Sequence, residues 1–139
     1  MKMSYFLGLG LILTVTGATG WLSGANDYLI DFISLAIILA TCLAALICNF
    51  GLRGSFSAIA ALVLSDQTIS SGFRKSAALT VILSGLLGGL LYLVIGVIAT
   101  LSSVEDPSLL ASSIAVSFIS LLYGSLVALL AVPSYVAAE

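Results

Sequence analysis

Serine hydroxyls recur at helical spacing near the C-terminal end of the chain, and they are its side chains best suited to chemistry. Ser113, Ser117 and Ser120, followed by Gly124, are three or four residues apart, which places them on one helix face. Thr100 lies in the preceding apolar run. Hydroxyls donate and accept hydrogen bonds, so several on facing helices favour a path for an ion or water. For any single serine, the alternative is a bond back to its own helix one turn earlier.

Titratable side chains are missing from the middle of the long apolar runs. No aspartate, glutamate, lysine, arginine or histidine lies deep within them. A charge near the centre of a bilayer is costly and usually functional. If the chain moves ions, we therefore expect a partner protein to supply the group that carries them.

Catalytic and metal-binding sets are missing as well. The sequence has no histidine, and its two cysteines, Cys42 and Cys48, fall in one expected helix. Their spacing corresponds to about 9 Å along the helix axis, which exceeds the usual Cα distance of a disulfide. We therefore expect no enzyme activity, no metal site and no cofactor.

The composition indicates an integral membrane protein. Hydrophobic residues make up 61% of the chain and charged residues 7%, which is too little charge for a water-soluble surface. The length of 139 residues suits a single domain, residues 1–139. Four stretches are long and apolar enough to cross a bilayer, at about 4–22, 28–50, 77–103 and 107–133. The sequence therefore predicts an all-α, polytopic membrane protein with four transmembrane helices.

The charged residues predict the orientation of these spans. The four basic residues lie at the start of the chain or within residues 51–76, whereas Asp27, Asp31, Glu105 and Asp106 cluster in the two other turns. The positive-inside rule then places both termini and residues 51–76 in the cytoplasm. Asp31, near the outer end of the second span, is expected to be a water-exposed terminal charge. A role in ion access or at an interface is the alternative.

The short cytoplasmic segment, residues 51–76, contains one apolar run of its own. Phe56–Leu64 is too short to span, so we predict a helix at the membrane surface or packed beneath the bundle. Ser70 or Ser71 is placed to cap a third helix that starts near Gly72.

Small residues mark the faces where helices approach closely. Gly85, Gly89 and Gly96 recur on one face of the third span, and Gly124 continues the serine face of the fourth. In lipid such faces are where helix backbones meet. They are either packing seams within one bundle or parts of a pore-lining assembly, and composition favours neither. The second span carries a further small-residue stripe, made of Ala36, Ala40, Ala44 and Cys48.

Two sequences in the last two spans are distinctive. Residues 96–107 read GVIATLSSVEDP, and residues 114–124 read IAVSFISLLYG. They resemble the third and fourth transmembrane helices of the MotA/TolQ/ExbB proton channel family, and within it those of the flagellar stator subunit MotA. Pro133 falls where the family has a proline after its fourth helix, and residues 29–35 are similar to the start of its second helix.

This resemblance implies a homopentameric ring in a bacterial inner membrane. The ring would surround two copies of a single-span partner like MotB, ExbD or TolR, whose membrane aspartate carries a proton or a sodium ion. Ion flow would then turn the pentamer around the partner dimer. Ser120 matches a fourth-helix threonine that faces the ion path in the family. Leu93 and Leu86 stand where the family has a threonine and a proline in its third helix.

The cytoplasmic segment departs from that pattern, because it is much shorter than the loop of a flagellar stator. Arg53, Arg74 and Lys75 are its cationic residues and the expected contacts with a load, which we expect not to be a standard flagellar rotor. The alternatives are an energiser of outer-membrane processes, like ExbB or TolQ, and a non-conducting scaffold that oligomerises through its glycine and serine faces.

Overall fold

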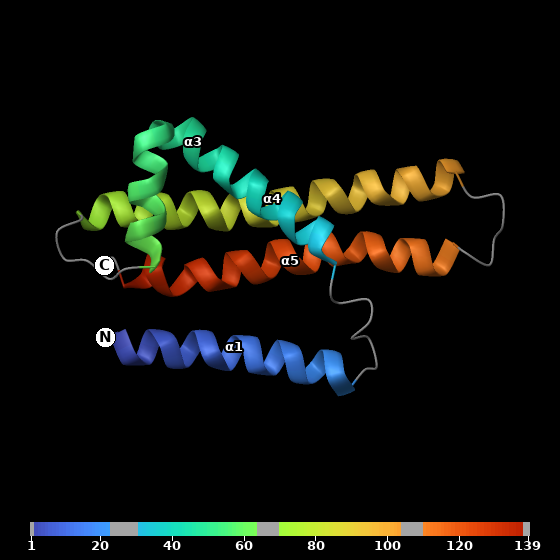
Figure 1. The fold of residues 1–139 in the computed structure, drawn as a ribbon, viewed down its shortest axis with the longest axis horizontal. Coiled ribbons are helices and arrows are strands. Elements are labelled where there is room, and N and C mark those ends of the chain that lie inside the picture. The colour runs from blue at the N-terminus through green and yellow to red at the C-terminus, as the bar shows by residue number, and fades with distance from the viewer. Residues whose placement is uncertain (1, 23–30, 64–69, 104–109, 138–139) are drawn as a thin grey trace. The chain divides into compact units, whose positions relative to one another are not determined.

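The computed structural model describes residues 2–22, 31–63, 70–103 and 110–137, and these residues are almost entirely helical (Figure 1). The helices are α1 (Lys2–Leu22), α3 (Phe32–Val63), α4 (Ser71–Ser103) and α5 (Leu110–Val136). Three stretches in them are long and apolar enough to cross a membrane: Phe32–Leu62, Ser71–Ser102 and Ile114–Val136. The predicted all-α membrane protein is thereby confirmed. A crossing by α1 stays a prediction.

The chain divides into two compact units, Met1–Phe32 and Ile33–Glu139. The first unit contains α1, in which the hydroxyls of Thr14 and Thr16 donate to the carbonyls of Leu11 and Ile12, at 3.0 and 2.8 Å. The second unit contains α4, α5 and all of α3 from Ile33 onward. All further contacts described below lie within the second unit.

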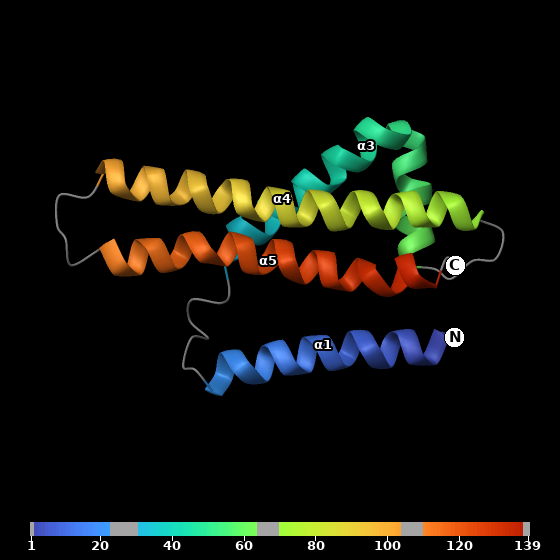
Figure 2. The ribbon, with the colours of Figure 1, turned by 180° about the vertical axis from the view of Figure 1, so that it is seen from behind.

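Helices α4 and α5 lie side by side in both ribbon views (Figures 1 and 2), and three glycines bring their backbones together. A Cβ atom built on Gly85 would lie 2.9 Å from the carbonyl oxygen of Gly124. A Cβ atom on Gly89 would lie 3.0 Å from the carbonyl oxygen of Ser120 and 3.1 Å from the Cα of Leu121. At these positions the two helices leave no room for a side chain.

The start of α4 lies where the sequence predicts it. The Phe73 amide donates to the Ser70 hydroxyl at 3.4 Å, and the Arg74 amide donates to the Ser70 carbonyl at 3.2 Å. Ser70 is therefore the N-cap residue. At the same end of the hairpin, α5 continues through Pro133 to Val136 and so exceeds the predicted span.

Helix α3 is bent at Gly51, whose backbone has φ 71° and ψ 172°. A positive φ of this size is open to glycine at little cost, so the helix can turn there. We call Phe32–Phe50 the first arm and Leu52–Val63 the second arm. The second arm lies across the start of α4 and the end of α5 (Figures 1 and 2).

The core of the second unit joins all three of its helices. The second arm contributes Ala58, which is buried in one cluster with Ala77 of α4 and Ala131 of α5. The Ser134 hydroxyl of α5 also donates to the Leu62 carbonyl at 3.0 Å. The apolar run predicted as a surface helix or as a helix beneath the bundle is therefore helical and packed on the ends of α4 and α5.

Substitution of Gly124 by alanine tests the α4–α5 contact. The new methyl group would collide with the Gly85 carbonyl oxygen and lie 3.0 Å from the Gly89 Cα. We expect the free energy of unfolding in detergent to fall by about 1–3 kcal/mol, as in other overpacked cores. Gly17→Ala in α1 is the control, because its methyl group would meet nothing within 4 Å. Equal stability of Gly124→Ala and the native chain would contradict the close contact.

Candidate functional site

Two of the α5 serines that the sequence singles out, Ser117 and Ser120, face other helices of the same unit. Ser117 is buried, and a Cβ atom built on Gly96 would lie 2.6 Å from its Oγ. Ser120 is half-buried beside Gly89. The structure thus brings Ser117 and Ser120 to the glycine face of α4, where they lie inside the helix bundle.

Ser120 also reaches the third helix of the unit. Its hydroxyl donates to the Oγ of Ser34 at 3.5 Å, and Ser34 is buried near the start of α3. This contact joins side chains of two helices, unlike the bond of Ser125, whose hydroxyl donates to the Leu121 carbonyl of its own helix at 2.7 Å. Ser120 therefore stands where α3, α4 and α5 meet.

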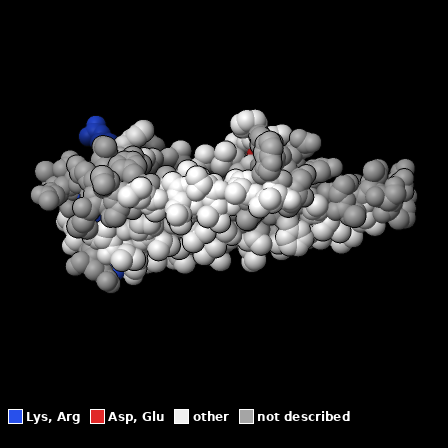
Figure 3. Space-filling model, turned by 90° about the horizontal axis from the view of Figure 1, so that it is seen from below, with Lys and Arg blue, Asp and Glu red and all other residues white. Residues whose placement is uncertain are grey.

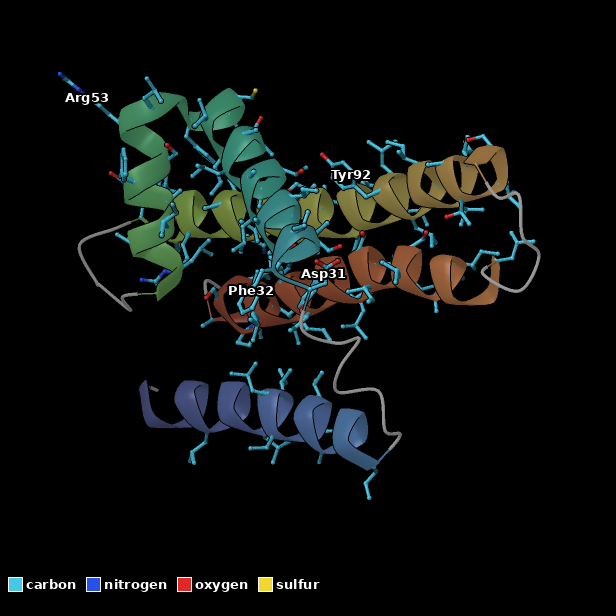
Figure 4. The ribbon with its side chains drawn as sticks, turned by 45° about the vertical axis from the view of Figure 1, so that its right-hand side comes forward. Asp31, Phe32, Arg53 and Tyr92 are labelled. Carbon is cyan, nitrogen blue, oxygen red and sulfur yellow. The ribbon has the colours of Figure 1, made fainter. Side chains whose placement is uncertain are left out.

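The contact of Ser120 is one of three polar pairs that fasten the first arm of α3 to its neighbours. The Oγ1 of Thr41 lies 3.1 Å from the hydroxyl of Tyr92, and the Nδ2 of Asn49 lies 3.1 Å from the Oγ1 of Thr80. Figure 4 shows Tyr92 on α4, on the side where α3 crosses it. We call the three pairs Ser34–Ser120, Thr41–Tyr92 and Asn49–Thr80 the polar seam.

The donor in two of the seam hydrogen bonds follows from a second hydrogen bond that each threonine makes. Thr41 donates its single hydroxyl proton to the Ile37 carbonyl at 2.9 Å, so Tyr92 is the donor to Thr41. Thr80 likewise donates to the Ser76 carbonyl at 2.9 Å and accepts from Asn49. We expect each pair to contribute about 0.6 kcal/mol to the free energy of unfolding, which is the mean for polar pairs between membrane helices.

Among the residues of this seam, the sequence singles out only Ser120. Ser120 is predicted, but Ser34, Thr41 and Asn49 are not singled out, although polar residues at spacings of seven and eight on an apolar helix were a usable signal. The small-residue stripe of the same helix lies elsewhere. Its four residues, Ala36, Ala40, Ala44 and Cys48, are exposed in the second unit.

The other residues of the predicted ion pathway either lie apart from Ser120 or have no described side chain. Thr100 is half-buried in the last turn of α4, and the side chain of Ser113 lies outside the described part of the structure. Asp31 is half-buried directly before α3, in the first unit (Figure 4). The acidic turn around Glu105 also lies outside the described residues.

The predicted cationic residues gather at one end of the second unit. In the described surface, this end carries the blue side chains of Figure 3. Arg53 is exposed at the bend of α3 and extends outward (Figure 4), whereas Arg74 and Lys75 are half-buried in the first turns of α4. The Lys75 Nζ lies 5.1 Å from the ring centroid of Tyr135 in α5, within the range of a cation–π contact.

Comparison with known protein families gives a match that covers α4 and α5. The family model described as the MotA/TolQ/ExbB proton channel family matches residues 70–138. These residues include all of α4 and α5, and with them the glycine contact and the serines that face it. No curated protein and no solved structure is significantly similar to the chain.

A double-mutant cycle on Thr41→Val and Tyr92→Phe tests the polar seam. Both changes remove a hydroxyl and keep most of the side-chain volume. We expect a coupling of about 0.6 kcal/mol in the free energy of unfolding in detergent, because each single change already breaks the shared bond. The control cycle pairs Thr41→Val with Ser125→Ala, whose hydroxyl bonds within its own helix. Additive effects in both cycles would argue against the seam.

Proposed function

The chain belongs, across residues 70–138, to the MotA/TolQ/ExbB proton channel family, and from this membership we propose that it is the channel subunit of an ion-driven membrane motor. Three described helices are long enough to cross a membrane. Together with the family match, they indicate an ion-channel, energiser-type membrane protein. The proposed motor converts the flow of protons or sodium ions into rotation around a single-span partner dimer. It would work in a bacterial inner membrane, with both termini in the cytoplasm.

The observation that carries this proposal is the inward position of the α5 serines within the matched segment. Ser117 and Ser120 lie against the glycine face of α4, so their hydroxyls are directed away from the lipid-facing side of these helices. Hydroxyl oxygens inside a bundle can replace part of the water around a passing ion. Ser120, which also contacts Ser34, is the proposed central residue of the path.

The proposed partner supplies the acid that the chain lacks. None of the expected spans has a carboxylate deep within it, so a proton carrier must come from another helix. Family members work as oligomeric channels. We propose a homopentamer around two copies of a single-span protein like MotB, ExbD or TolR, with its membrane aspartate next to Ser120.

The two alternative functions are a non-conducting scaffold and an energiser of outer-membrane processes. A scaffold that oligomerises through its glycine faces is disfavoured, because Gly85, Gly89 and Gly124 are occupied by the α4–α5 contact within one chain. An energiser like ExbB or TolQ differs from a motor only in its load. The load would be met at the end of the second unit that carries Arg74 and Lys75.

Replacement of the Ser120 hydroxyl tests the path. In proteoliposomes that contain the chain and its partner, we expect Ser120→Ala to lower ion flux by about 5- to 150-fold, since loss of one properly placed polar group costs about 1–3 kcal/mol. Ser125→Ala is the matched control, because that hydroxyl bonds to its own helix, and its flux should stay near the native value. Equal ion flux through Ser120→Ala and the control would show that the Ser120 hydroxyl is not part of the path.

The assembly is tested by co-expression with a single-span protein whose membrane segment contains an aspartate. Native mass measurement is expected to give a complex of five copies of this chain with two of the partner. A chain that stays monomeric in the presence of that partner would contradict the proposed motor.

A further inference from the structure

The second arm of α3 has a buried face and an exposed face. Ser55, Ala58 and Ala61 are at most 2% exposed and form the face toward α4 and α5. Leu52 and Phe56 are 68% and 74% exposed on the opposite side. Large apolar side chains thus point away from the bundle, while the small ones point into it.

The exposed face is itself divided into an apolar edge and a polar edge. At 100° per residue, Leu52, Phe56 and Ile59 fall within one narrow sector of the helix. Arg53 and Ser57, which are also exposed, fall in the neighbouring sector. This arrangement is typical of a helix that lies in a membrane interface, with its apolar edge in the acyl chains and its cations among the headgroups.

The length of the first arm is compatible with a second arm at the depth of that interface. Phe32–Phe50 is about 28 Å long at 1.5 Å per residue, close to the roughly 30 Å hydrocarbon core of a bilayer. An arm of this length that crosses the hydrocarbon from Phe32 onward would bring the bend at Gly51 to the membrane boundary. Beyond it, the second arm packs at Ala77, directly after the cationic first turns of α4.

The charges at this end fit an anionic surface. All charged side chains described there are cationic, namely Arg53, Arg74 and Lys75. Arg53 is the exposed one and extends outward from the bend of α3 (Figure 4). A contact with a second copy of the chain fits less well, because charged residues are depleted in the cores of protein interfaces.

We propose that the second arm of α3 is an interfacial anchor that binds anionic phospholipid of the surrounding bilayer. Leu52, Phe56 and Ile59 enter the outer part of the acyl chains, and Arg53 binds the phosphate of the headgroup. The arm would thereby fix the height of the second unit in the membrane at the end where its load is expected.

Tryptophan fluorescence in vesicles tests this anchor in the full chain. Trp21→Phe removes the one native tryptophan, and Phe56→Trp or Ser57→Trp then introduces a probe on the apolar or the polar edge. The vesicles consist of phosphatidylcholine and phosphatidylglycerol, with bromine near the headgroup end of the acyl chains of one lipid at a time. We expect brominated lipid to quench the probe at 56, and aqueous iodide to quench the probe at 57.

The difference in quenching between the two brominated lipids tests the role of Arg53. Brominated phosphatidylglycerol should quench the probe at 56 more than brominated phosphatidylcholine, with a local enrichment of about fivefold for one exposed basic residue. Arg53→Gln should abolish this preference and keep the quenching itself. Equal quenching by both lipids in the native background would overturn the anionic-lipid contact.

Two other outcomes would also overturn the anchor. A probe at 56 that lipid bromine does not quench would mean that water or another copy of the chain covers the apolar edge. Equal lipid quenching at 56 and 57 would place the whole arm inside the hydrocarbon. Since no partner and no ion gradient is needed, the result is independent of ion conduction.

Discussion

The contact between the backbones of α4 and α5 is the constraint on which the second unit depends. Without a hydrophobic force between helices in lipid, close packing of small residues is the main source of association. Gly85 and Gly89 meet Gly124 and the backbone around Ser120 so closely that no Cβ atom fits. The register of the hairpin follows from these positions, and it fixes which side chains of α5 face α4.

That register explains why Ser117 and Ser120 lie inside the bundle. Gly96 continues the glycine face and leaves space for Ser117, while Gly89 does the same for the backbone at Ser120. A larger residue on α4 would move the two helices apart. The serine hydroxyls would then face lipid or donate to carbonyls of their own helix. The glycines therefore position the serines, although they offer no polar group of their own.

Much of this hairpin could be predicted from the sequence, because its signals are local. The cap at Ser70 and the spacing of Gly85 and Gly89 follow directly from residue types and helical periodicity. The family of the segment 70–138 is likewise encoded in contiguous sequence. The role of Ser120 in an ion path stays a prediction.

The course of α3 was harder to predict, because its determinants are not local. Gly51 permits a bend in α3, as other glycines of the chain would, but the direction of the second arm depends on contacts with Ala77 and Ala131, far along the chain. The polar seam was missed for a similar reason. Thr41 gains meaning only when Tyr92 is placed opposite it by the packing of α3 on α4. The predicted span ends at Pro133, yet α5 continues through it to Val136, and Ala131 and Ser134 on either side of the proline are buried.

Two kinds of contact hold the second unit together. Helices α4 and α5 are joined by backbone contact along a glycine face. The first arm of α3 is joined to them by the three side-chain pairs of the polar seam and by the buried side chains of Ile38, Cys42 and Leu46 in the core. Because Ser34 contacts Ser120, the packing of α3 on the hairpin also sets the surroundings of the proposed ion path.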